Sequence, residues 1–97
     1  YAKNRKQFGC AISKHQGIRW QIADMATQIE AARQLVLSAA AMKDNKKKYT
    51  AQASMAKLFA SEMVNKVTAR AIQIHGGYGF TKDYPVERFY RDARVFT

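Results

Sequence analysis

The chain has 97 residues, of which 47% are apolar, and this size predicts one globular domain with a small core. A single cysteine, Cys10, excludes an internal disulfide framework and leaves too few ligands for a structural zinc site, so we expect an ordinary free thiol near a turn. Seventeen Lys and Arg against seven Asp and Glu give a net charge of +10, which indicates an anionic partner, but no motif typical of RNA or DNA binding accompanies it.

The first residues, up to Arg5, are expected to be the tail of a helix that begins in preceding polypeptide, with Gly9 allowing a turn between helices. A first long helix is predicted from about Ser13 to Asp44. Its apolar residues step alternately by four and three, which places them on one stripe of a helix: Ile18, Ile22, Met25, Ile29, Ala32, Val36 and Ala39. Ser13 and Gln16 have the spacing of a capping box.

A second helix is predicted from Thr50 to His75. Its stripe is rich in alanine and consists of Ala53, Ala56, Ala60, Met63, Val67, Ala71 and Ile74. Small side chains allow two helix backbones to approach closely, so we expect antiparallel packing against the first helix. Gly76 or Gly77 should end the helix in the left-handed conformation.

A third, short helix is predicted from Pro85 to about Val95, since proline suits the first helical position. The lysine-rich run from Lys43 to Lys48 between the first two helices is interpreted as a solvated loop rather than a binding patch. The fold class is therefore all-α: a partial up-down four-helix bundle with two long antiparallel helices and a short third helix. The remaining helix faces must be covered by other polypeptide, so we expect the chain to be part of a longer protein without membrane insertion.

Three motifs occur in order along the chain: Arg5-Lys6-Gln7-Phe8-Gly9, then Gln73-Ile74-His75-Gly76-Gly77, then Arg88-Phe89-Tyr90-Arg91-Asp92-Ala93-Arg94. Together they resemble the C-terminal helical domain of the FAD-dependent acyl-CoA dehydrogenases, over nearly all of residues 1–97. The second motif does not match the Gly-x-Gly-x-x-Gly fingerprint of a dinucleotide-binding βαβ unit, and no strand is predicted before it.

The resemblance implies contacts to the adenosine diphosphate part of FAD, partly across a dimer interface. The residues that it implies for this cofactor site are Arg5, Gln7, Phe8, His15, Gln16, Gln73, Ile74, His75, Gly76 and Gly77. An arginine suits phosphate oxygens, and glycines let the backbone approach a ligand closely. Read locally, Gln16 is instead a capping residue, and the two glycines are a plain helix stop.

Other polar and aromatic residues are given structural roles. His75 is expected to pack or to line the cofactor site rather than to act as an acid or base, and Tyr78 and Phe80 are expected to be pocket walls. Ion pairing at the end of the bundle is expected of Arg88, Arg91, Asp92 and Arg94. The glutamates Glu30, Glu62 and Glu87 are read as exposed helix charges.

The family's reaction is the α,β-dehydrogenation of acyl-CoA thioesters to 2-enoyl-CoA in fatty-acid or branched-chain acyl catabolism. The resemblance implies FAD as cofactor, an acyl-CoA substrate, electron-transfer flavoprotein as acceptor, and a homodimer or homotetramer in the cytoplasm of a bacterium or in the mitochondrial matrix. No catalytic residue and no metal ligand is expected in this segment, because the family's catalytic glutamate lies outside it, and the isolated chain should be inactive. The alternative is a basic helical module for binding or oligomerisation.

Overall fold

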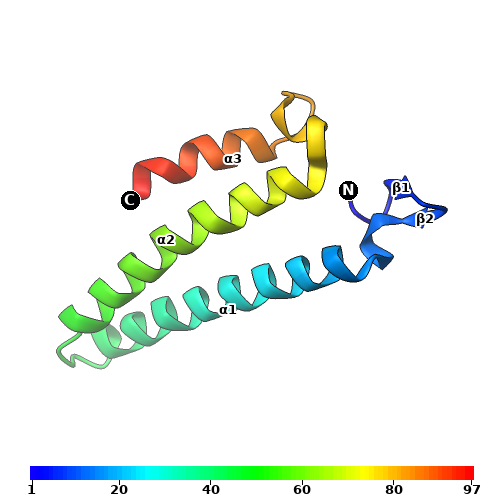
Figure 1. Cartoon of the computed structure of the whole chain (residues 1–97). Coiled ribbons are helices and arrows are strands. Elements are labelled where there is room, and N and C mark those ends of the chain that lie inside the picture. Colours follow the sequence, from blue (N-terminus) through cyan, green and yellow to red (C-terminus); the bar gives the residue numbers. More distant parts are fainter.

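The computed structural model describes all residues from Tyr1 to Thr97 and confirms an all-α fold (Figure 1). Its helices are α1 (Gln16–Asp44), α2 (Thr50–His75) and α3 (Val86–Ala93). Short 3-10 segments occupy η1 (Ile12–Lys14), η2 (Gly76–Phe80) and η3 (Arg94–Phe96). The molecule measures 55 × 25 × 16 Å, because the two long helices run antiparallel and α3 returns along α2.

The start of α1 differs from the prediction by three residues. Ser13 lies within η1, where its N–H donates to the Ala2 carbonyl at 3.0 Å, and its neighbour Ile12 is buried. His15 has extended backbone angles (φ −76°, ψ 132°) and precedes Gln16, but no side chain caps the helix. The predicted capping box is therefore wrong, because burial of Ile12 draws Ser13 into a separate turn. The predicted end at Asp44 is confirmed.

The apolar stripe of α1 is only partly covered by α2. Ile18, Met25, Ala32 and Ala39, seven residues apart, are buried or half-buried as predicted. The second line of the predicted stripe stays exposed by 39% to 48% and consists of Ile22, Ile29 and Val36. Half-buried residues at the same spacing take its place: Gln21, Gln28, Leu35 and Met42. The contact face is thus rotated around α1, since α2 covers one side of the stripe and no helix of this chain covers the other.

The bounds of α2 agree with the prediction, the residues of its alanine stripe are all buried or half-buried, and one side of the helix packs against α1. Ala56 is 6% exposed, and its small side chain allows the helices to pack closely. The opposite side of α2 packs against α3 and η3. From α2, Asn65 Nδ2 donates to the Ala93 carbonyl at 3.3 Å and Lys57 Nζ donates to the Phe96 carbonyl at 2.6 Å. The helix α2 is therefore the central element between α1 and α3.

The helix α2 ends at His75, and the following Gly76 has a positive φ of 63°, as expected of a terminating glycine. Its ψ of −139° lies outside the left-handed helical region, so the predicted left-handed cap is wrong in its detail. This combination of angles is essentially restricted to glycine. The chain turns sharply there and continues into η2, while the Gly76 N–H donates to the Gln73 carbonyl.

The helix α3 is one residue shorter at its start than predicted, since Pro85 precedes Val86, and η3 continues it to Phe96. Of the four charged residues expected to form ion pairs, only Arg91 does so, with Glu87 one turn earlier at 2.8 Å. Ion pairing of Arg88, Asp92 and Arg94 was wrongly predicted: Arg88 lies 5.3 Å from the Phe89 ring centroid instead, and the other two have no partner.

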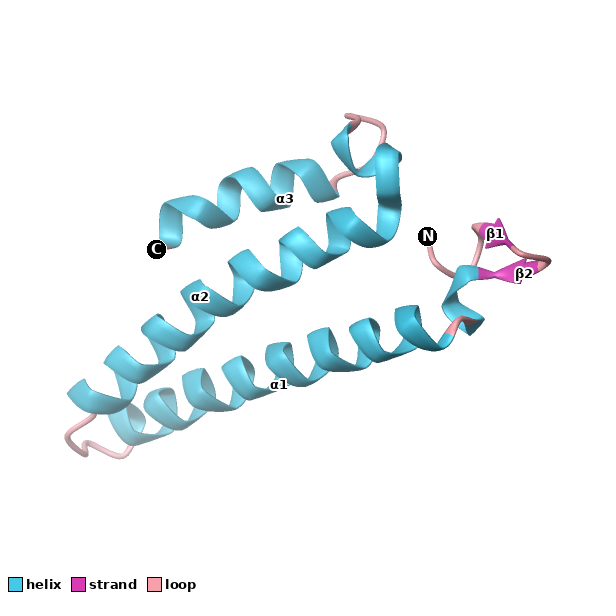
Figure 2. Cartoon of the chain, viewed as in Figure 1, coloured by secondary structure: helices cyan, strands magenta, loops and turns pink.

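The segment before α1 forms a small hairpin that the sequence did not predict (Figure 2). After a turn at Tyr1–Arg5, in which the N–H groups of Asn4 and Arg5 both donate to the Tyr1 carbonyl, strands β1 (Lys6–Gln7) and β2 (Cys10–Ala11) pair antiparallel. Phe8 and Gly9 connect the strands with positive φ values of 53° and 83°. Two central residues with positive φ are characteristic of a type I′ hairpin turn.

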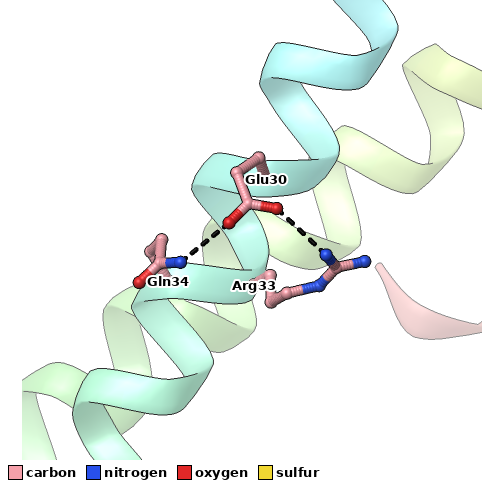
Figure 3. A network of polar contacts seen from close by, with 3 residues as sticks. All are labelled: Glu30, Arg33 and Gln34. Atoms are coloured by element: carbon pink, nitrogen blue, oxygen red, sulfur yellow. Dashed lines mark hydrogen bonds and ion pairs between the residues drawn. The ribbon is translucent and has the colours of Figure 1, made fainter.

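An exposed part of α1 carries a local polar network (Figure 3). The Glu30 carboxylate accepts hydrogen bonds from Arg33 at 3.0 Å and from Gln34 at 2.7 Å, all on one helix face. These side chains are exposed, which agrees with the interpretation of Glu30 as a surface charge. The lysines between α1 and α2 are likewise exposed, and none of the helices has the length and apolar character of a membrane span.

Candidate functional site

A cavity of about 510 Å³ lies at the end of the molecule where the N-terminal segment, the start of α1 and the end of α2 meet. Figure 1 shows the N-terminus, the hairpin and the C-terminal end of α2 at this end. Eight of the ten residues expected in a cofactor site line this cavity: Arg5, Gln7, His15, Gln73, Ile74, His75, Gly76 and Gly77. Two motifs that are far apart in the sequence thus form one concave surface.

The other two expected residues lie outside the cavity lining. Phe8 is at the tip of the hairpin and is 94% exposed, with its ring edge-on to His15 at 5.9 Å. Gln16 is the first residue of α1 and is exposed. Because no side chain caps α1, the capping role considered for Gln16 is not observed.

The remaining lining residues are Tyr1, Ile12, Ile18, Tyr78 and Thr81. Tyr78 agrees with its expected role as a pocket wall, whereas Phe80 is 81% exposed and borders a different hollow between α2 and α3. Ile18 is the first residue of the apolar stripe of α1, so the sequence pattern indicated that it is covered, and here it lines the cavity. No sequence pattern indicates Tyr1 or Thr81.

Aromatic rings connect three parts of the chain beside the cavity. The Tyr1 ring stacks on His75 with centroids 4.2 Å apart, and Tyr84 meets both rings edge-on at 5.4 and 5.3 Å. The His75 Nδ1–H donates to the Ala71 carbonyl at 2.8 Å. His75 is thereby held in a packing position, as expected.

The hairpin is tied to the start of α1 by His15. Its Nε2–H donates to the Gln7 carbonyl at 3.0 Å, and Cys10 Sγ lies 3.9 Å from the same nitrogen. Cys10 is a half-buried free thiol, as expected. His15 therefore supports the hairpin that carries Gln7 and Phe8.

The cavity is suited to an anion. Its lining contains Arg5 and no acidic residue. The first turn of α1, which also contains no acidic residue, adjoins it through Ile18. The N-terminal end of a helix carries partial positive charge, so α1 adds to the field of Arg5 and offsets the negative end of α2.

The backbone at the end of α2 is open to the cavity. A Cβ added at Gly76 or Gly77 would meet no atom within 4 Å, so nothing in this chain fills the space beside them. Gln73 supplies amide donors and acceptors on the same side. The site can therefore bind a phosphate-bearing molecule through a guanidinium, side-chain amides and exposed backbone groups.

Comparison with known proteins agrees with this geometry. The family model for the acyl-CoA dehydrogenase C-terminal domain matches residues 1–97. The caffeyl-CoA reductase–Etf complex subunit CarC of Acetobacterium woodii is 61% identical over 97 residues, which is all of this chain and 26% of the relative.

Two solved structures superpose closely on the chain. The butyryl-CoA dehydrogenase of Megasphaera elsdenii has a TM-score of 0.97 at 48% identity and covers 99% of this chain and 25% of its own. The FAD complex of PigA has a TM-score of 0.95 at 30% identity, again over 99% of this chain and 25% of its own.

The chain thus spans about a quarter of the length of the relatives it matches. Because the family model covers every residue and the three helices superpose on solved members, the chain belongs to the acyl-CoA dehydrogenase family, in which it matches the C-terminal domain.

Proposed function

We propose that this chain is the part of a flavin-dependent acyl-CoA dehydrogenase that holds the adenosine diphosphate end of FAD. The observation that carries the proposal is the convergence of two separated motifs on one cavity without acidic side chains. A volume of about 510 Å³ lies within the range of roughly 300 to 1,000 Å³ that is usual for ligand sites. A basic module that binds or oligomerises without a cofactor gives no reason for these residues to meet.

The donor set fits the cofactor's polar groups. The Arg5 guanidinium would pair with the diphosphate oxygens, and the amides of Gln7 and Gln73 would bind ribose or adenine. Gly76 and Gly77 would bring their backbone groups close to the ligand. Ile74, His15 and His75 would form the walls.

Phe8 and Gln16 are proposed contacts beyond the cavity. A large aromatic residue with positive φ and 94% exposure is unfavourable in an isolated chain. Strained backbone of this kind concentrates at functional sites. Phe8 would gain its partner when the cofactor or a second subunit covers the hairpin tip.

The activity proposed for the whole protein is oxidoreduction at the Cα–Cβ bond of an acyl-CoA thioester, with 2-enoyl-CoA as the oxidised form. FAD, when bound, supplies the hydride acceptor, and this chain binds and orients its nucleotide end. The resemblance to the family implies a catalytic glutamate outside this segment, so we assign the catalytic base to polypeptide outside residues 1–97. The isolated chain is therefore expected to be inactive.

The proposed partners follow from the relatives and from the exposed apolar residues. One relative is named as a subunit of a complex with Etf, which supports electron-transfer flavoprotein as the redox partner. The uncovered line of Ile22, Ile29 and Val36 supports packing against further polypeptide of the same protein, within a homodimer or homotetramer. The compartment would be the cytoplasm of a bacterium or the mitochondrial matrix.

FAD titration of the full-length apoprotein tests the proposal with a matched pair of variants. Arg5→Ala removes a charge from the cavity, whereas Lys48→Ala removes an equal charge from the α1–α2 turn at the far end of the molecule. We expect Arg5→Ala to raise the dissociation constant for FAD by about 10- to 100-fold, the usual size for a hydrogen bond to a charged group. Lys48→Ala should leave it unchanged. Equal effects, or none, would refute the proposed site.

A further inference from the structure

The Arg5 side chain rests on an aromatic ring rather than on a carboxylate. Its Cζ lies 5.5 Å above the centroid of Tyr78, within the distance of a cation–π contact. None of the three ion pairs of the chain involves Arg5. The guanidinium therefore keeps its charge available to a ligand while the ring restricts its position.

The Tyr78 ring is itself fixed by its surroundings. The next residue, Gly79, is buried so closely on α2 that an added Cβ would lie 2.7 Å from the Ile72 carbonyl oxygen. Tyr84 meets the Tyr78 ring edge-on at 5.9 Å. The close approach of Gly79 to Ile72 fixes the distance between η2 and α2, and the contact with Tyr84 fixes the orientation of the Tyr78 ring.

We infer that Tyr78 is a positioning residue, which holds the Arg5 guanidinium in the cavity for the phosphates of the cofactor. The inference rests on the proposed function of the site. In this arrangement a residue of η2, Tyr78, orients an arginine of the N-terminal segment, Arg5. Tyr78 acts here through the face of its ring, not through its hydroxyl, which donates no hydrogen bond within the chain.

The physical basis is preorganisation. An arginine loses rotamer freedom when it binds a ligand, and each side chain immobilised in this way weakens binding appreciably. A guanidinium that already lies over a ring has lost part of this freedom before the ligand arrives. A phenylalanine ring offers the same negative face, whereas glutamine or leucine offers none.

The test is a double-variant cycle measured by FAD titration of the full-length apoprotein. The variants are Tyr78→Leu, Tyr78→Phe and Arg5→Ala, together with the combination of Tyr78→Leu and Arg5→Ala. We expect Tyr78→Leu to weaken FAD binding by about two- to tenfold and Tyr78→Phe by less than about twofold. In the Arg5→Ala background Tyr78→Leu should have no further effect, because it acts through Arg5.

Two results would overturn the positioning role of Tyr78. If Tyr78→Leu weakens binding equally with and without Arg5, the effect is structural and the inference is wrong. A loss with Tyr78→Phe as large as with Tyr78→Leu would assign the effect to the hydroxyl and would also overturn it. If Tyr78→Leu does not fold, Tyr78→Gln replaces it, since the half-exposed position accepts a polar side chain.

The proposed function can fail separately from this inference. If Arg5→Ala does not weaken FAD binding, the phosphate site itself is wrong, and the role of Tyr78 falls with it. If Arg5→Ala weakens binding while Tyr78→Leu does not, the site stands and only the positioning role is refuted.

Discussion

Tyr1 and His75 lie face to face, with ring centroids 4.2 Å apart and planes inclined by 22°. The Tyr1 hydroxyl also donates to the His75 carbonyl at 3.3 Å. This contact joins the first residue of the chain to the last residue of α2. It thereby closes one side of the cavity between the N-terminal segment and η2.

Replacing Tyr1 by leucine should therefore destabilise this end of the protein. Loss of a stacked aromatic pair is expected to lower the free energy of unfolding by about 0.5 to 1.5 kcal/mol beyond the change in buried area. Tyr90→Leu is the control for the loss of a tyrosine ring outside a stack, because Tyr90 is 45% exposed and pairs with no other ring. Chemical denaturation of the full-length protein measures both variants, and equal losses would contradict the role given to the stack.

A methyl group at Gly79 should be poorly tolerated. The added Cβ would lie 2.7 Å from the Ile72 carbonyl oxygen, and a backbone atom cannot move aside as a side chain can. We expect Gly79→Ala to cost about 1 to 3 kcal/mol, as for overpacked cores. Gly17→Ala, in α1 with no atom within 4 Å, should instead stabilise by about 0.5 to 1 kcal/mol. Thermal unfolding that shows the same sign for both variants would contradict this packing.

The alanine seam between α1 and α2 should resist larger side chains. Ala56 is buried on the alanine stripe of α2, so Ala56→Leu is expected to cost about 1 to 3 kcal/mol by overpacking. Ala51 lies exposed on the same helix, and Ala51→Leu should change stability by less than about 0.5 kcal/mol. Denaturant titration of both variants checks this, and a tolerated Ala56→Leu would mean that the seam is looser than described.

Replacing Phe8 by glycine should raise the stability of the protein but weaken FAD binding. Phe8→Gly relieves a residue with φ of 53° and is expected to stabilise the protein by up to about 1 kcal/mol. The same change removes the exposed ring and should weaken FAD binding. Phe8→Leu keeps the strained backbone but not the ring, so it should weaken binding without the gain in stability. Melting temperatures and FAD titrations of both variants measure the two effects. Unchanged FAD binding in both variants would exclude a contact between Phe8 and the cofactor.

The ion pair of Glu87 and Arg91 predicts a change of stability with pH. The hydrogen bond from Arg91 holds the pKa of the Glu87 carboxyl below its ordinary value of 4.5. The folded state therefore binds this proton less readily than the unfolded state. The contribution to stability is complete above pH 4.5 and disappears as the pH falls through the folded-state pKa.

Glu87→Gln removes this titration and should flatten the acid limb of the stability curve. The difference in stability between the original protein and the variant should be constant above the ordinary pKa and shrink below it. Glu62→Gln is the control, because Glu62 is exposed and forms no ion pair. Denaturation at a series of pH values measures the difference, and parallel curves would contradict the predicted shift.

The sequence predicted some elements more accurately than others for physical reasons. The bounds of α2 were predictable because an alanine stripe runs without interruption to paired glycines. The hairpin was not, since strands of two residues have no periodicity and a phenylalanine with positive φ follows no turn preference. In α1 the periodicity located an apolar stripe, but it could not indicate which of its lines a partner helix would cover.

The candidate site was only partly accessible from the residues themselves. The lining residues Arg5 and Gln73 came from the resemblance to a family, because neither a lone arginine nor a glutamine before two glycines specifies a ligand. The positive end of α1 at the cavity became visible only in the fold, after the predicted capping box had proved absent. The contact between Arg5 and Tyr78 likewise depends on how η2 packs, which the sequence pattern does not specify.

The structure of the full-length protein with FAD bound would show directly whether this cavity holds the adenosine diphosphate end of the cofactor. We expect the diphosphate oxygens to lie within hydrogen-bond distance of the Arg5 guanidinium, with the adenosine end beside Gln73, Gly76 and Gly77. A structure in which FAD binds elsewhere, and this cavity is filled by other side chains, would contradict it.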